Sequence, residues 1–120
     1  MTELRYLAPG TLDEAIGAFA KAGGAAHILA GGTDLLVQMR SGAVKPGVIV
    51  DIKKIPEMTS IEQAADGSFR IGAAVSGMAL AEHKSFGKVW PGVLEAINLI
   101  GSKQVQGRCT MVGNLCNAGP

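Results

Sequence analysis

Apolar and polar positions in the first third of the chain follow two alternating periods. Short apolar runs at residues 4–7, 26–30 and 48–52 predict three strands, and the third run is mostly β-branched. Between the first two runs, apolar residues recur at helical spacing after the capping-box pair Thr11 and Glu14, and Gly23-Gly24 ends that helix. A short helix over 35–40 precedes the third strand. The pattern therefore predicts β-α-β-α-β, which is typical of a small α/β unit.

The pattern changes after a boundary near residues 53–56. Two runs at 59–64 and 68–74 flank Asp66-Gly67, which is a strong hairpin signal. Ser76 is a candidate cap for a short helix that ends near Glu82. A second helix is predicted after Trp90-Pro91-Gly92, with apolar residues of one face continuing to Ile100 and a stop at Gly101.

The tail, residues 109–120, combines strand formers with small turn residues, and we expect a turn over 110–114. The turn residues at 117–120 give no sign of a finished terminal element. We therefore expect the chain to be the front part of a longer fold.

Composition and charge exclude several classes of protein. The 120 residues carry 11 basic and 10 acidic side chains, and no basic run exceeds Lys53-Lys54, which argues against a nucleic-acid partner. No apolar stretch is long enough for a membrane span, and the N-terminus lacks the apolar core of a secretion signal. Two cysteines cannot form a disulfide framework or a four-cysteine cluster. These features favour a reducing, cytoplasmic setting.

The turn formed by Gly31, Gly32, Thr33 and Asp34 is the strongest candidate for a binding site. It lies between an apolar strand and a helix, where free N–H groups and a glycine backbone suit a phosphate or pyrophosphate. The alternative is a tight turn in which Thr33 or Asp34 only caps the helix. The segment matches neither the Gly-x-Gly-x-x-Gly fingerprint of a Rossmann fold nor a P-loop.

A second candidate is the segment from Thr110 to Asn114, in which a hydroxyl, a glycine backbone and an amide could line a ligand. The alternative is an ordinary turn, because Gly and Asn favour turns without any ligand. For His27 and His83 we favour surface or capping roles, since neither has the spacing of a metal site. Cys109 and Cys116 are expected to be buried and inert. No catalytic acid, base or nucleophile is predicted, and no metal site.

The two candidate segments together resemble a known family. The run from Leu29 to Arg40 is similar to the first flavin-binding motif of the FAD subunit (medium subunit) of molybdenum hydroxylases, a group that includes xanthine dehydrogenase and carbon monoxide dehydrogenase. Residues 100–105 followed by 110–120 resemble the second motif. The family usually carries two adjacent glycines there, whereas this chain has Val112 before Gly113.

The resemblance implies an α+β fold of the p-cresol methylhydroxylase and vanillyl-alcohol oxidase type, with two FAD-binding subdomains, truncated here at its C-terminal side. Residues 1–55 would form a small β-α-β subdomain and residues 56–120 the start of the second. FAD would lie noncovalently between them with its pyrophosphate on the first loop, and a side chain at Gly32 would occupy space that the pyrophosphate needs. The implied FAD-binding residues are Leu29, Ala30, Gly31, Gly32, Thr33, Asp34, Leu35, Leu36, Ile100, Thr110, Met111, Val112, Gly113 and Asn114.

The resemblance also implies partners. A large subunit would hold the molybdenum-pterin centre, and a small subunit would carry two [2Fe-2S] clusters that pass electrons to the FAD. The flavin would deliver them to NAD, oxygen or a quinone. Two alternatives remain open from the sequence: a stand-alone flavoprotein oxidoreductase of the same fold, similar to a cell-wall-precursor reductase, or a non-catalytic fragment without cofactor.

Overall fold

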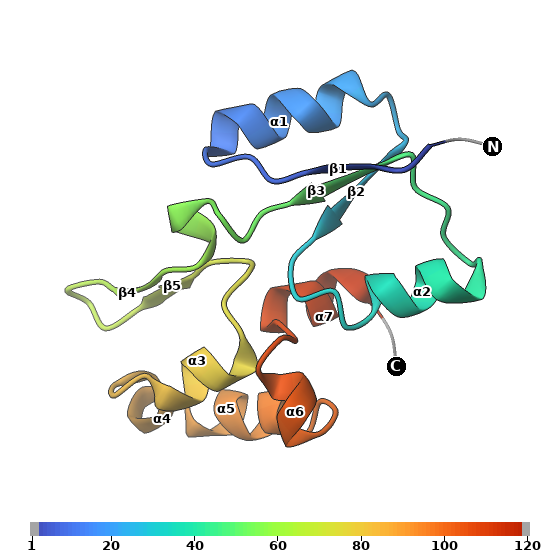
Figure 1. Ribbon diagram of the computed structural model, residues 1–120. Helices are drawn as coiled ribbons and strands as arrows, with labels where there is room; N and C mark the ends of the chain where they lie inside the picture. Colours follow the sequence, from blue (N-terminus) through green and yellow to red (C-terminus); the bar gives the residue numbers. More distant parts are fainter. Residues whose placement is uncertain (1–2, 119–120) are drawn as a thin grey trace.

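The computed structural model describes residues 3–118, and its first region is a three-stranded parallel sheet in the order β1-β3-β2 (Figure 1). The strands are β1 (Arg5–Leu7), β2 (Ala26–Leu29) and β3 (Val48–Asp51). Helix α1 (Leu12–Lys21) connects β1 to β2, and α2 (Leu35–Ser41) connects β2 to β3. The predicted β-α-β-α-β order is confirmed, with each strand slightly shorter than expected.

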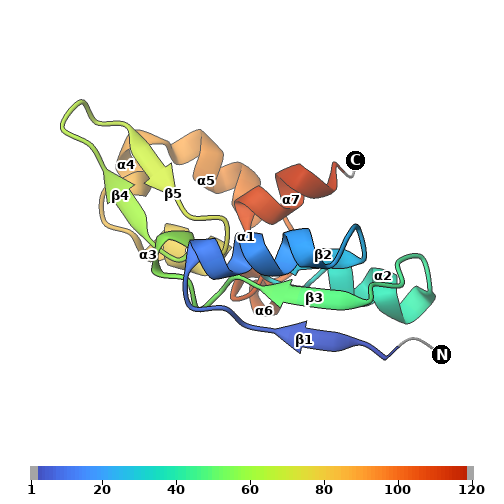
Figure 2. The same cartoon turned by 90° about the horizontal axis from the view of Figure 1, so that it is seen from above.

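Helix α1 covers the upper side of this sheet, as Figures 1 and 2 show from two directions. The Thr11 hydroxyl accepts a hydrogen bond from the Glu14 N–H at 3.2 Å, as the capping-box pattern predicts. The Glu14 carboxylate reaches back to the N–H of Gly10 at 3.2 Å, one residue before the N-cap Thr11 that a standard capping box would use. The first hydrophobic core lies between α1 and the sheet and consists of Ala15, Ala26, Val50, Ile52 and Ile55.

The second region is a hairpin followed by five short helices. The hairpin pairs β4 (Ile61–Gln63) with β5 (Phe69–Ile71) in antiparallel register, around the predicted Asp66-Gly67 turn. A 3-10 turn, η1 (Pro56–Met58), precedes it. The helices are α3 (Gly77–Glu82), α4 (Phe86–Val89), α5 (Pro91–Asn98), α6 (Lys103–Gln106) and α7 (Met111–Asn117).

A second hydrophobic core holds these helices to the hairpin. Ser76 caps α3 as predicted, since its hydroxyl accepts from the Ala79 N–H at 3.1 Å. The first core is not confined to residues 1–55, because Met58 packs against it beside its buried member Ile55. The division into units 1–55 and 56–120 therefore stays a prediction. The buried residues of the second core are Val75, Leu80, Phe86 and Ile97.

The predicted turn over residues 110–114 is wrong, because these residues begin helix α7. The Thr110 hydroxyl accepts a hydrogen bond from the Gly113 N–H at 2.9 Å and so caps the helix. A Cβ at Gly113 would lie 2.6 Å from this hydroxyl, so the glycine permits the cap. The last two residues of the second motif, Gly119 and Pro120, lie outside the described residues.

Helix α5 also differs from the prediction at both ends. It begins at Pro91 itself and ends at Asn98, so Ile100 lies beyond the helix and not on its apolar face. Only Ile97 of this helix is buried, and Val93 is 37% exposed. Gly101 follows with a φ of 66°, a conformation that glycine adopts at little cost.

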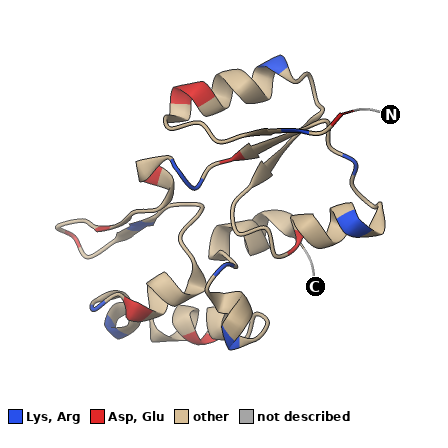
Figure 3. Ribbon diagram, in the orientation of Figure 1, with Lys and Arg blue, Asp and Glu red and all other residues tan. Residues whose placement is uncertain are grey.

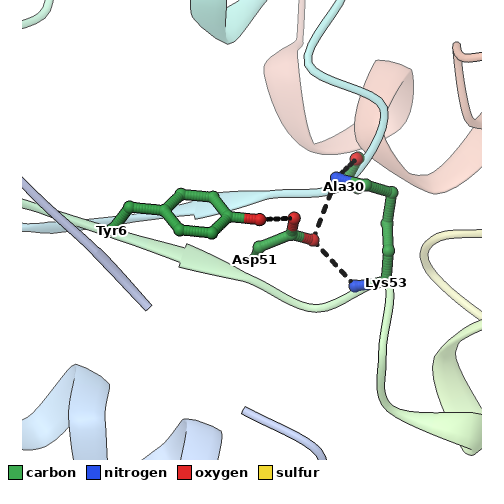
Figure 4. Close-up of polar contacts among 4 residues, drawn as sticks. All are labelled: Tyr6, Ala30, Asp51 and Lys53. Atoms are coloured by element: carbon green, nitrogen blue, oxygen red, sulfur yellow. Dashed lines mark hydrogen bonds and ion pairs between the residues drawn. The ribbon is translucent and has the colours of Figure 1, made fainter. Parts of the chain in front are cut away.

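A polar cluster at the end of β3 ties three parts of the first region together (Figure 4). Asp51 is only 5% exposed, and its carboxylate accepts hydrogen bonds from the Tyr6 hydroxyl on β1 and from the Lys53 backbone N–H. The Lys53 ammonium lies 2.9 Å from the same carboxylate and donates to the carbonyl oxygen of Ala30 at 3.0 Å. The cluster therefore links β1, β3 and the segment that leaves β2.

These contacts shift the pKa of two groups in opposite directions. Burial by itself raises the pKa of the Asp51 carboxyl, but the hydrogen bonds from Tyr6 and Lys53 and the Lys53 charge outweigh it and lower the pKa below its usual value. The hydrogen bond to Asp51 raises the pKa of the Tyr6 hydroxyl above its usual value. The ionised carboxylate is therefore the form that the fold stabilises.

We expect Asp51→Asn to destabilise the fold in a pH-dependent manner. The pKa of Asp51 is lower in the folded than in the unfolded chain, so the carboxylate stabilises the fold above an unfolded-state pKa of about 3.9, and this contribution is lost as the pH falls through the lowered value. At neutral pH the variant should lose about 1.5–3 kcal/mol, the range for hydrogen bonds to charged groups.

Urea unfolding curves at neutral pH and below about pH 4 test this expectation. The difference between wild type and Asp51→Asn should narrow in acid, and Glu95→Gln, at an exposed position of α5, should change little at either pH. An equal difference at both pH values would show that the ionised form of Asp51 is not what the fold uses.

Candidate functional site

A cleft of about 930 Å³ brings the two sequence motifs together. It lies between α1, the segment after β2, the start of α2 and helix α7, and most of its lining is apolar. Three of the predicted site residues, Leu29, Leu36 and Met111, are not part of its wall. The predicted residues that do line it are Ala30, Gly31, Gly32, Thr33, Asp34, Leu35, Ile100, Thr110, Val112, Gly113 and Asn114.

The loop that enters α2 leaves a row of backbone donors without partners. The N–H groups of Gly32, Thr33 and Asp34 donate to no acceptor within residues 3–118. Asp34 occupies the N-cap position but makes no capping hydrogen bond, because its carboxylate accepts from the Gln38 side chain at 2.9 Å. The alternative that Thr33 or Asp34 merely caps the helix is therefore not what this part of the structure shows.

Gly31 is required by a close contact with the main chain. A Cβ at this position would lie 2.0 Å from the carbonyl oxygen of Arg108 and 3.2 Å from the Cα of Cys109. No side chain fits there unless one of the two segments moves. The first glycine of the pair therefore packs the loop against the residues that lead into α7.

Gly32 is required for a different reason from the one expected. Its φ is +78°, which strains any other residue, and its Cβ would meet the side chain of Leu29 at 2.9 Å and that of Leu36 at 3.3 Å. A side chain at position 32 would therefore point at apolar neighbours. This direction differs from the expected one, in which the side chain would take space from a pyrophosphate. Leu29 and Leu36 lie behind the loop.

The second motif supplies the opposite wall of the cleft. Thr110 is 4% exposed, and its bridge to Ser76 and the hydrogen bond from Gly77 N–H to the Cys109 carbonyl at 2.9 Å fix the start of α7. Its hydroxyl oxygen is used as the helix cap. Val112 lines the cleft at the position where a glycine was expected from the family pattern.

The two histidines and two cysteines differ in their burial and contacts. The Nδ1 atom of His83 accepts from the N–H groups of Ser85 and Phe86, which confirms a capping role. His27 lines the cleft and is half-buried. Burial raises the pKa of the Cys109 thiol, as expected for an inert cysteine. Cys116 is exposed, so the expectation of burial is wrong there.

Sequence reasoning missed the apolar wall of the cleft. Ile16 is 59% exposed and Phe19 43% exposed, and their helical spacing predicted the helix without assigning them to a site. Of α1, only Ala15 is fully buried. The sequence feature that could have revealed this wall is the apolar face of α1, which is wider than one small sheet can cover. The missed lining residues with large apolar side chains on α1 and β2 are Leu12, Ile16, Phe19 and Ile28.

Charge is distributed without a dominant sign. Figure 3 shows basic and acidic residues interspersed over both regions. Within residues 3–118, no group of three His, Cys, Asp or Glu side chains is arranged to hold a metal ion. The helices of this same range are all too short or too polar to cross a membrane.

Comparison with known proteins gives consistent matches over the chain. The profile of a family described as "FAD binding domain in molybdopterin dehydrogenase" matches residues 2–120. The chain is 37% identical over 92 residues to the xanthine dehydrogenase FAD-binding subunit of Escherichia coli O157:H7, covering 77% of this chain and 32% of that protein. It is 31% identical over 116 residues to the nicotinate dehydrogenase FAD-subunit of Eubacterium barkeri, covering 96% and 39%.

The fold is similar to that of solved structures as well. Carbon monoxide dehydrogenase from Hydrogenophaga pseudoflava, in a form described as lacking the Mo-pyranopterin moiety of the molybdenum cofactor, matches with a TM-score of 0.88 at 31% identity. The match covers 94% of this chain and 39% of that one, so the chain spans less than half the length of these relatives. Both the resemblance and the fold class predicted from it are confirmed. The chain belongs to the family of FAD-binding domains of molybdopterin dehydrogenases.

Proposed function

We propose that the cleft binds FAD noncovalently, with the pyrophosphate on the loop before α2. The observation that carries this proposal is the row of free N–H groups at Gly32, Thr33 and Asp34. Consecutive backbone donors at a helix start favour an anion, because they have no other partner and the helix dipole adds to their charge. The fit is supported by the apolar wall from α1, which suits the aromatic rings of the cofactor.

The fourteen predicted residues then have two kinds of role. The loop from Ala30 to Leu35 and the start of α7 lie on the cleft and would contact the cofactor, together with Ile100. Leu29 and Leu36 would act indirectly, since they pack behind Gly32. Met111 would also act indirectly, because it packs against the second hydrophobic core.

We propose that the biochemical role of the chain is electron transfer from a multi-subunit molybdenum hydroxylase to an external acceptor. FAD supplies redox chemistry when bound, while the chain's own residues bind, orient and shield it. Proposed partners are a large molybdenum-pterin subunit and a small iron-sulfur subunit, with NAD, oxygen or a quinone as acceptor. The names of the relatives as FAD subunits of dehydrogenases support this role. A reducing, cytoplasmic setting is part of the same proposal, and the free thiols of Cys109 and Cys116 agree with it.

Purification of the complete natural protein from its own cells tests the proposal. We expect flavin absorbance, release of FAD on mild denaturation, and molybdenum and iron in the same complex. Flavin in a protein without molybdenum or iron would favour a stand-alone flavoprotein. A colourless complete protein that cannot be loaded with FAD would contradict the proposal.

Gly32→Ala in the complete protein should weaken FAD binding by about tenfold or more, because strain at φ +78° displaces the loop donors. The matched control is Gly67→Ala in the β4–β5 hairpin, where φ is +89° and a Cβ would meet nothing within 4 Å. Both variants should lose similar stability, about 1–2 kcal/mol.

Fluorescence titration with FAD and thermal unfolding separate the two effects. Gly67→Ala should bind FAD like the wild type despite its reduced stability. Equal FAD affinity in both variants would place the cofactor away from this loop.

A further inference from the structure

We propose that Lys53, held by Asp51 and Tyr6, is a positioning residue for the loop that begins at Gly31. Its ammonium fixes the Ala30 carbonyl and thereby presets the direction of the N–H groups that follow. This inference rests on the proposed FAD site, but it concerns how the chain prepares that site in the absence of any ligand.

The geometry places the restraint directly before the loop. The Ala30 carbonyl and the Gly31 N–H belong to one rigid peptide plane, so a bond to the carbonyl oxygen fixes the orientation of the whole plane. The Lys53 ammonium lies 3.0 Å from that oxygen and 2.9 Å from the Asp51 carboxylate (Figure 4). Because Tyr6 and the Lys53 N–H also bind this carboxylate, the ammonium is anchored to the end of β3.

The loop needs restraints of this kind because its own hydrogen bonds hold its carbonyl side and not its donors: the Gly32 carbonyl accepts from the Leu36 N–H at 3.2 Å, whereas the N–H groups of Gly32, Thr33 and Asp34 have no acceptor within residues 3–118. Asp34 provides no capping bond, and two adjacent glycines leave the backbone conformationally free. The second restraint comes from the other side, where Gly31 packs against the main chain of Arg108. The loop is therefore held between the Lys53 contact and the Arg108 contact.

A direct role for Lys53 as counter-charge to a phosphate fits the structure less well. Neither Lys53 nor Asp51 is among the described residues that line the cleft. The Lys53 charge is already paired with a carboxylate that is almost fully buried. The two roles predict opposite effects of removing the Asp51 charge, because a direct role would gain from freeing the ammonium whereas a positioning role would lose its anchor.

FAD titration of the complete natural protein tests the proposal with three variants and a control. Lys53→Met and Asp51→Asn should each weaken FAD binding by about tenfold, since each breaks a charge-assisted contact, and Tyr6→Phe should have a smaller effect of the same sign. Lys54→Met is the matched control: it removes the same charge one residue away, at an exposed side chain that makes no hydrogen bond or ion pair within residues 3–118, and should change affinity less than about twofold. Tighter binding in Asp51→Asn, or equal effects of Lys53→Met and Lys54→Met, would overturn the proposal.

A ligand-free measurement makes the result independent of FAD. In protein labelled with ¹⁵N-glycine, backbone order parameters of Gly31 and Gly32 should be high in the wild type and in Lys54→Met, and should fall in Lys53→Met and Asp51→Asn. Unchanged order in a folded Lys53→Met variant would contradict the positioning role even if FAD affinity fell. If order falls in the two variants but the wild-type protein itself takes up no FAD, the positioning role stands and the proposed function is refuted.

Discussion

The contact between Gly31 and the carbonyl oxygen of Arg108 leaves no room for even a methyl group, and the rest of the site depends on it. It joins two segments that are far apart in the sequence, the loop after β2 and the residues that lead into α7. The bridge between Ser76 and Thr110 and the hydrogen bond from the Gly77 N–H to the Cys109 carbonyl hold the second segment to the start of α3. With the hydrogen bond from the Gln38 side chain on α2 to that of Asn117 on α7 at 3.2 Å, this contact brings the ends of the parallel sheet and of the helical region to a common cleft.

The chemistry of the cleft follows from how the two helix starts are completed. Thr110 caps α7 with its own hydroxyl, so that end is finished internally. The start of α2 is not, because the Asp34 carboxylate accepts from the Gln38 side chain and the N–H groups of Gly32, Thr33 and Asp34 have no acceptor among residues 3–118. Unpaired backbone donors at a folded surface bind water or an anion. The first loop is thus the part of the site that we propose for the pyrophosphate, whereas α7 forms part of the opposite wall.

Local signals were sufficient for most of the fold. The capping pair Thr11 and Glu14, the Asp66-Gly67 turn and the Ser76 cap each involve residues within four positions of one another, and all three were confirmed. The start of α7 was missed although Thr110 is a standard cap, because Gly113 and Asn114 equally favour a turn. In the structure, Thr110 also forms a bridge to Ser76, a long-range contact at the helix start that no local pattern reveals.

The site was less predictable than the fold because its parts are set by tertiary packing. An amphipathic pattern identifies the apolar face of α1, but it cannot tell that Ile16 and Phe19 stay exposed along a cleft while Ala15 is buried. The cluster of Tyr6, Asp51 and Lys53 joins residues on separate strands and carried no motif. The most direct test of the central claim is a crystal structure of the complete protein with FAD. The account predicts pyrophosphate oxygens about 2.7–3.2 Å from the backbone nitrogens of Gly32, Thr33 and Asp34, and a pyrophosphate bound elsewhere with these N–H groups facing solvent would contradict it.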